Sequence, residues 1–202
     1  WRGRIQFAVV QQRGDDTDQG IEADNNANNQ NLLPRSEPTL YNLTLVGDPS
    51  TEFGPESTDG ARIRVGTAGH IHNFIFTGFK ASGIDVRDAS TVANIGTGAL
   101  DISHGILFSN GPGGNRNWAT NATTVTARTA FAATVNELDP MLVAPFNRTA
   151  PDWRPLPGSP ALALAPRIPP NDGFFEIALY RGALGPLLEN DWTRGWTNFA
   201  QR

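Results

Sequence analysis

A short segment recurs three times in the chain, and this repeat constrains the fold more than any other feature of the sequence. The copies are LYNLTLVG from Leu40, IHNFIFTG from Ile71 and ISHGILFSN from Ile102, so consecutive copies begin 31 residues apart. The first two share the pattern apolar-x-Asn-apolar-x-apolar-x-Gly, and the third begins in the same way before slipping by one residue. A repeat of this length with strand-like alternation inside each copy is typical of a β-solenoid.

Each repeat contains two strand-like arms separated by glycine-rich turns. Alternation turns Ile63 and Ile84 inward and Arg62, Arg64 and Arg87 outward. The first arms are predicted at 40–46, 71–77 and 102–108, and the second arms at 61–65, 84–87 and 92–95. Such arms are expected to stack into parallel sheets around a common core.

Equivalent positions in the repeat predict a ladder in the core and a row of polar residues at the bends. The expected core ladder is Leu43, Phe74 and Ile106 or a near neighbour. Asn42 and Asn73 are equivalent, and His104 stands in the third copy. Stacked asparagines at a bend can hydrogen-bond along the solenoid axis and satisfy backbone groups that the bend leaves unpaired. We therefore interpret this row as structural.

The chain is expected to form one structural domain with three parts. These are solenoid coils over 1–110, a loop and capping helix over 111–150, and a proline- and aromatic-rich wrapping tail over 151–202. Proline cannot continue a sheet, so we expect the tail to wrap the end of the solenoid and cover its open edge. Further elements are predicted as strands over 4–10, 20–24 and 174–180 and as a helix over 126–138.

The composition excludes several classes of protein. The chain of 202 residues has a formal net charge of −4 and no cysteine, which excludes disulfides and thiolate metal sites and argues against a nucleic-acid surface. No apolar run approaches the roughly 20 residues of a membrane span. The chain begins at Trp1 in a strand-like segment, so we expect it to be part of a longer precursor.

Several segments besides the repeat carry a family resemblance. They are DQGIEADNN (18–26), ELDPMLV (137–143), RPLPGSPAL (154–162), YRGALG (180–185) and DWTRGWTNF (191–199). With the repeat arms they resemble the C-terminal part of bacterial exported proteins with the pectate-lyase-like architecture. The resemblance implies an all-β right-handed parallel β-helix with a short helix and a proline-rich C-terminal tail. It implies no activity, because that family is largely without assigned chemistry.

Five carboxylates within ten residues form the candidate metal site, namely Asp15, Asp16, Asp18, Glu22 and Asp24. Calcium takes roughly six to eight oxygen ligands, so it is the one cofactor to which the sequence points. The resemblance adds a use for it, because polysaccharide lyases of this architecture use calcium to neutralise uronate substrates. The spacing matches no EF-hand loop, which favours a solvated acidic turn as the other interpretation.

Two histidines of the repeat form a second candidate functional site. His70 and His72 alternate, so both should lie on one face of a strand, where two imidazoles could bind a metal or shuttle protons. No carboxylate close in sequence completes a site, which favours an exposed pair. Asp101, Ser103 and His104 include the residue types of a catalytic triad, yet neighbours in sequence cannot adopt its geometry.

Aromatic residues near the C-terminus are the candidates for partner binding. Trp192, Trp196 and Phe199 are spaced by four and three residues, so a helical turn would place them on one face, and Trp153 could join them. Plugging the end of the solenoid core is the favoured interpretation. The alternative is an apolar anchor for a protein partner or a membrane interface, where tryptophan is common.

Three functions remain open at this point. We expect no catalytic residues and favour a non-catalytic structural or binding module outside the cytoplasm, as an accessory subunit of a larger cell-envelope or membrane-associated assembly. One alternative is a calcium-dependent polysaccharide lyase or glycosidase fragment, with Asp85, Asp88 or the acidic cluster facing across a cleft. The other is a carbohydrate-binding β-helix that stacks polysaccharide on Trp118.

Overall fold

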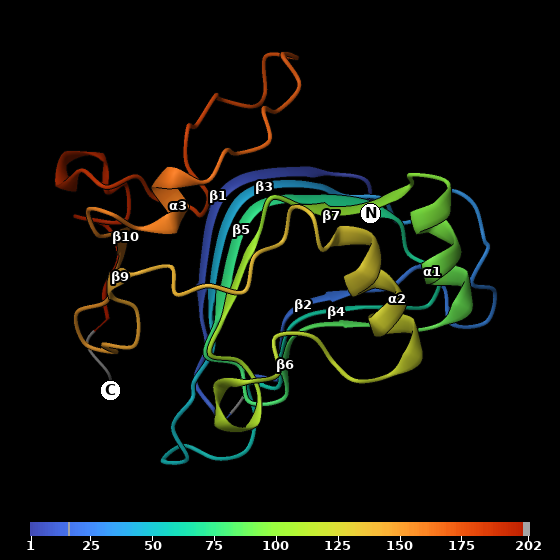
Figure 1. Ribbon diagram of the computed structural model, residues 1–202, viewed down its shortest axis with the longest axis horizontal. Coiled ribbons are helices and arrows are strands. Elements are labelled where there is room, and N and C mark those ends of the chain that lie inside the picture. Colours follow the sequence, from blue (N-terminus) through green and yellow to red (C-terminus); the bar gives the residue numbers. More distant parts are fainter. Residues whose placement is uncertain (16, 200–202) are drawn as a thin grey trace.

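The computed structural model describes residues 1–15 and 17–199, which form a parallel β-solenoid of about three turns with a tail along its side (Figure 1). In this view the strands of successive coils lie behind one another. The architecture is consistent with a right-handed β-helix, as the repeat predicts. The elements are β1 (Arg4–Gln11), β2 (Gln19–Ala23), β3 (Thr39–Val46), β4 (Asp59–Ile63), β5 (Gly69–Thr77), β6 (Ser82–Val86), α1 (Ala89–Gly96), β7 (Leu100–Ser103), β8 (Ile106–Phe108), η1 (Pro112–Gly114), α2 (Ala122–Phe131), β9 (Leu142–Ala144), β10 (Asp152–Pro155), α3 (Pro160–Ala163) and η2 (Leu188–Asn190).

Two parallel sheets enclose the core. The first has the order β1-β3-β5-β7, with β8 also paired to β5, and the second has the order β2-β4-β6. In the first sheet Leu40 pairs with Ile71, and Ile71 pairs with Ile102, so the spacing of the repeat is the spacing between coils. The expected strands of the coils are confirmed, except for the arm predicted at 92–95.

Residues 92–95 belong to helix α1 and not to a strand. The helix turns a buried polar side toward the preceding coil, where the Gly66 amide donates to Thr91 Oγ1 at 2.9 Å. Asn94 Nδ2 donates to the carbonyl oxygens of Gly66 and Thr67 at 3.1 and 2.9 Å. Thr91 and Asn94 are three residues apart, which puts both on one helix face, so these bonds favour a helix where alternation suggested a strand.

The third copy of the repeat does not slip, which corrects one detail of the expected ladder. Leu43 pairs with Phe74 inside the core, and the constant register sets Gly105 opposite Phe74. A Cβ atom on Gly105 would lie 2.0 Å from the Phe74 ring, so glycine makes room for that ring. Ile106 therefore faces outward, and its neighbour Leu107 enters the core in its place.

The row of bends predicted at Asn42, Asn73 and His104 is confirmed by the backbone. These residues have φ angles of 55°, 56° and 56°, and Phe7 on the first coil has 58° at the equivalent place. Asparagine is among the side chains that tolerate this left-handed region best. Each bend divides a strand of the first sheet into two halves with differently covered outer faces.

Helix α2 closes the last coil. The Asn121 side chain accepts a hydrogen bond from the Thr124 amide at 2.9 Å, so the helix starts earlier than the predicted 126. It ends at Phe131 and not at 138, because the chain then forms a parallel bridge between Asn136 and Ile106. Buried residues of α2 and the segment after it join the core: Ala127, Phe131 and Val135.

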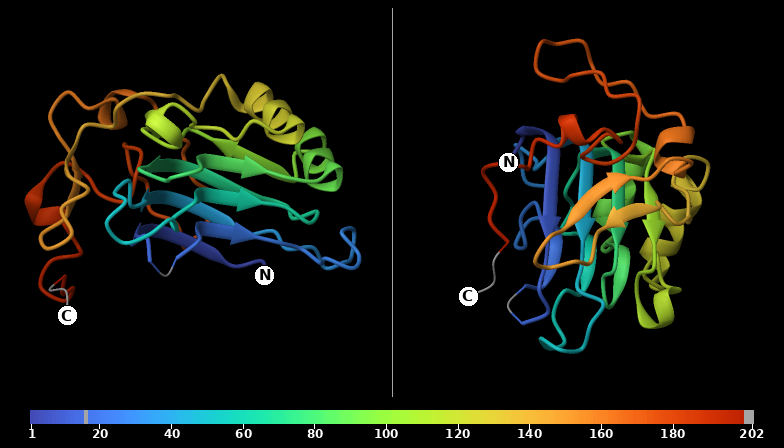
Figure 2. Two further views of the ribbon diagram at one scale, coloured as in Figure 1. Left: turned by 90° about the horizontal axis from the view of Figure 1, so that it is seen from below. Right: turned by 90° about the vertical axis from the view of Figure 1, so that its left-hand side faces the viewer.

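The tail lies across the outer face of the first sheet and does not run along an open strand edge (Figure 2). Trp153, Ala183 and Leu184 pack on Val46, while Leu142 and Ala161 pack on Ile75 and Ile106. Strand β10 at the start of the tail pairs antiparallel with β9, which precedes the tail. The strand predicted over 174–180 is irregular chain.

Candidate functional site

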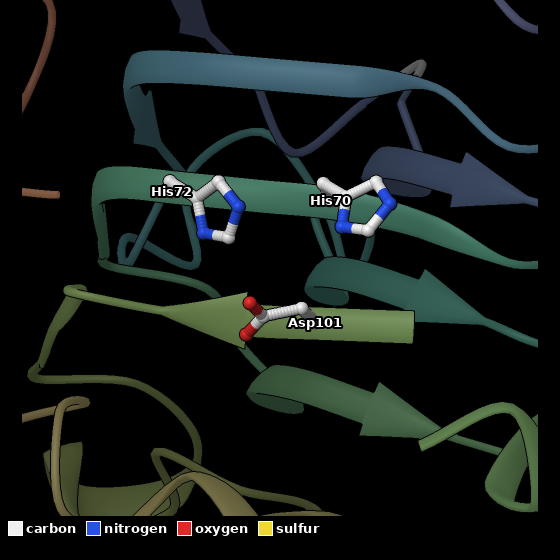
Figure 3. A group of neighbouring side chains, drawn as sticks. All are labelled: His70, His72 and Asp101. Atoms are coloured by element: carbon white, nitrogen blue, oxygen red, sulfur yellow. The ribbon is translucent and has the colours of Figure 1, made fainter. Parts of the chain in front are cut away.

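Two histidines and an aspartate gather on the outer face of the first sheet (Figure 3). His70 and His72 project from β5, and Asp101 projects from β7, where its Cα is the register partner of His70. One ligand atom from each of the three side chains lies within 4.8 Å of the other two. Among residues 1–15 and 17–199 this is the group of three or more metal-ligating side chains that comes together.

The expectation of an exposed histidine pair is wrong for His72. Both histidines share the outer face as predicted, but His72 is only 2% exposed. Its Nδ1 lies 2.8 Å from Ser103 Oγ, and the Tyr41 ring packs against its ring with centroids 4.8 Å apart. Burial lowers the pKa of His72 to about 3, with the nearby Arg167 charge acting in the same direction. The imidazole is therefore neutral at neutral pH.

Asp101 faces a cation from the tail. Its carboxylate lies 3.7 Å from Nη1 of Arg167, whose side chain is about half exposed. Asp101, Ser103, His104 and Arg167 line part of a shallow depression of about 470 Å³ between β7 and α2. Solvent and small ions can therefore approach this side of the histidine cluster.

The repeat itself contains the signal for this cluster, although no carboxylate lies close in sequence. The position 31 residues after His70, one coil later, is Asp101, and the corresponding position after His72 is Ser103. The third repeat copy therefore supplies the carboxylate that the second copy lacks. Ser103 does meet a histidine, but it is His72 of the neighbouring strand and not His104.

Several carboxylates of the acidic cluster form ion pairs with arginine side chains. Asp15 pairs with Arg13, and Asp24 lies 3.0 Å from Nε of Arg64, which also pairs with Glu22. The Thr58 hydroxyl lowers the pKa of Asp18 by donating to its carboxylate. Asp16 lies outside the described residues. The acidic side chains that the structure describes are not directed at a common point, and calcium binding there stays a prediction.

Arg62 is the centre of the charges on the outer face of the second sheet. It lies 2.5 Å from Asp59, 3.6 Å from Asp85 and 3.8 Å from Asp18. Asp85 also accepts hydrogen bonds from Arg87 and Asn121, both at 2.7 Å. These carboxylates therefore hold the coils and the helix cap together.

Asp88, the other carboxylate considered for a glycosidase, has a local structural partner. Its Oδ2 accepts a hydrogen bond from the Val65 amide at 2.7 Å, which secures a turn of the preceding coil. Trp118, the residue expected to stack sugars, is only 6% exposed and belongs to the core. A carbohydrate platform on Trp118 is therefore excluded.

The four aromatic residues predicted for partner binding lie together. Trp192 and Trp196 stack with centroids 6.2 Å apart, and Trp153 meets Phe199 edge to face at 5.4 Å. All four line a cavity of about 260 Å³ together with Val9, Gln11, Thr193 and Thr197. They lie on the outer face of the first sheet, and none belongs to the core between the sheets.

The parallel solenoid of about three turns has the architecture of a β-helix domain. The chain belongs to the family of pectate-lyase-like beta helix domains, which matches residues 1–153. The remaining tail lies beyond the matched region. No curated protein and no solved structure matches the chain. In the part of the chain that the structure describes, no helix has the length and apolar character needed to cross a membrane.

Proposed function

We propose that the chain is a non-catalytic binding module that works outside the cytoplasm and docks onto a protein partner through its tail. The observation that carries this proposal is the concentration of exposed large apolar side chains after residue 166. Ile177, Leu179 and Trp196 are 68%, 71% and 70% exposed. The others are Ile168, Phe174, Leu187, Leu188 and Trp192. A stretch of chain that exposes so many large apolar side chains favours an interaction surface.

The shape of the tail supports docking. The loop between α3 and η2 projects from the outer face of the first sheet (Figure 1), where Asn42 and Asn73 hold its two ends. Gln6 also exchanges two hydrogen bonds with the backbone of Glu176 in the middle of the loop. A projecting loop with fixed ends presents its apolar side chains at a smaller entropy cost than a free chain would.

The charged face supports a non-catalytic role. A lyase or glycosidase needs a base or a pair of carboxylates free to reach the substrate. Arg62 instead pairs with Asp59 on its own strand and with Asp85 of the next coil, and Arg64 pairs with Asp24 of the preceding coil. Such pairs stabilise the stack of coils and engage those carboxylates, so they are not free to act on a substrate.

Site-specific photo-crosslinking in the native host tests the docking proposal. A photoreactive residue replaces Ile177, Leu179 or Trp196, and the matched control replaces Val125, an apolar side chain on α2 that is 53% exposed. We expect one discrete crosslinked protein from the tail positions and none from Val125. Equal crosslinking from Val125, or no discrete product from any tail position, contradicts the proposal.

Carbohydrate binding is a second candidate, favoured by the Trp192–Trp196 pair. Exposed aromatic rings beside Gln11, Thr193 and Thr197 combine stacking surface with hydrogen-bonding groups around the cavity. Titration with oligogalacturonates, followed by tryptophan fluorescence in wild type and Trp196→Ala, tests it. Saturable binding that is lost in Trp196→Ala, together with absent crosslinks, would favour this function over protein docking.

A further inference from the structure

We propose that His70, His72 and Asp101 bind a divalent transition-metal ion, zinc foremost, on the outer face of the first sheet. The three side chains come from adjacent strands of a rigid solenoid, and one ligand atom from each already lies within 4.8 Å of the others. The proposal is independent of docking by the tail, because none of the three residues belongs to it.

The ligand types select the metal. Two imidazoles and one carboxylate suit zinc, which bonds nitrogen and oxygen ligands at about 2.0–2.2 Å and commonly takes three protein ligands with one open position. Four-coordinate geometry places neighbouring ligand atoms roughly 3.4 Å apart, so the ligand atoms must approach one another by up to about 1.4 Å. His70 and Asp101 are only partly buried and can rotate to do so. Calcium and magnesium prefer all-oxygen sites and are disfavoured here.

The surroundings of His72 prepare that residue as a ligand. Ser103 Oγ lies 2.8 Å from Nδ1, which leaves Nε2 as the ring nitrogen available to a metal. Metal-ligating histidines usually have such a partner on their other nitrogen, because it orients the ring. Packing by Tyr41 restricts the ring further, with the two ring centroids 4.8 Å apart.

The Arg167 side chain is a cation that would compete with a metal ion for Asp101. Its guanidinium lies 3.7 Å from the Asp101 carboxylate and approaches the histidines from the tail. A metal ion and this guanidinium repel each other and compete for the same carboxylate. The backbone of Arg167 is held separately by Asn73, so the side chain can swing outward or be replaced while the tail stays in place. Removing the guanidinium should therefore strengthen metal binding.

Zinc titration of the full chain without a histidine tag tests the site, with a chromophoric zinc indicator as competitor. We expect one equivalent to bind, and we expect His70→Ala and Asp101→Asn each to weaken binding by about tenfold or more. Arg167→Gln should tighten it by about threefold or more, because a like charge is removed. Cobalt bound to the wild type should give a visible absorption band that Asp101→Asn loses.

The control variant is His104→Asn. The chain has three histidines, so this change removes the one outside the proposed ligand set. Asparagine is the residue found at the equivalent bends of the two preceding coils, so the fold should tolerate it. We expect zinc affinity to stay within about twofold of wild type. The proposal is overturned when His70→Ala and Asp101→Asn, folded by circular dichroism, bind zinc as wild type does, or when His104→Asn weakens binding equally.

Discussion

The side-chain amide of Asn73 binds the backbone of Arg167 through both its oxygen and its nitrogen. Asn73 Oδ1 accepts from the Arg167 amide at 2.7 Å, and Asn73 Nδ2 donates to the Arg167 carbonyl at 2.9 Å. One coil earlier, Asn42 Nδ2 donates to the carbonyls of Tyr180 and Gly182 at 3.0 and 3.2 Å. The asparagines that were expected to bond along the solenoid axis thus bind mainly the tail.

Replacing Asn73 with glycine should release the tail from the solenoid. Glycine tolerates the φ angle of 56°, so the change removes two hydrogen bonds without straining the bend. We expect a loss of about 2 kcal/mol in unfolding free energy, at roughly 1 kcal/mol per bond, together with faster proteolysis of residues 164–182. Urea denaturation and limited proteolysis measure these effects.

His104→Gly is the matched control for Asn73→Gly. It lies at the same bend, one coil later, and its Nδ1 has no hydrogen-bond partner. A tail released equally by both changes would show that the bend, and not the amide of Asn73, holds the tail.

Gly105→Ala should overpack the core. The added Cβ atom would lie 2.0 Å from the Phe74 ring, so that ring or the strand must move. We expect a loss of roughly 1–3 kcal/mol in unfolding free energy by chemical denaturation. Phe74→Leu should recover part of that loss in the double variant. Losses that simply add would contradict a direct clash between these two positions.

Arg62→Met should destabilise the stack of coils strongly. The side chains of Asp59 and Asp85 are 3% exposed; Arg62 pairs with Asp59 and shares Asp85 with Arg87. Removing one partner of a buried pair costs about 3–5 kcal/mol. The control is Arg128→Met, which removes the exposed pair with Glu137 and should cost about 0–1 kcal/mol. Similar melting temperatures for the two variants would contradict a structural role for Arg62.

Stability should fall in acid because of His72. Its pKa is about 3 in the folded protein and near the ordinary 6.5 in the unfolded chain, so between these values only the unfolded chain binds the proton. The unfolding free energy should therefore fall as the pH drops below 6.5, by up to about 1.4 kcal/mol per pH unit. Urea denaturation with a chelator present, between pH 7 and pH 4.5, measures this slope.

His72→Gln is the control for the acid effect. Glutamine does not titrate, so the variant should lose this part of the slope even when its overall stability is lower. The carboxylates of Asp18 and Asp48 have lowered pKa values and titrate below this pH window. An unchanged slope in His72→Gln would assign the acid sensitivity to other groups.

The spacing of the repeat predicts the histidine–aspartate cluster, although the three residues do not suggest a site when each is considered alone. The register that pairs Ile71 with Ile102 also pairs His70 with Asp101, so one spacing accounts for both core and cluster. Helix α1 was not predictable in this way, because Thr91 and Asn94 are stabilised by bonds to another coil. The position of Arg167 depends on Asn73, 94 residues away, which no local pattern encodes.

The sequence by itself determined the architecture: strand alternation and a constant spacing leave few folds other than a stack of parallel coils. Only the tertiary structure decided how the charges and the tail are used. Arg62 and Arg64 form ion pairs with acidic residues. The tail covers one half of the first sheet, and its loop exposes apolar side chains. The physical reason is the distance along the chain over which each interaction acts. The periodic pattern shows which side of its own strand a residue faces. Ion pairs and tail contacts instead join segments whose separation in sequence follows no period.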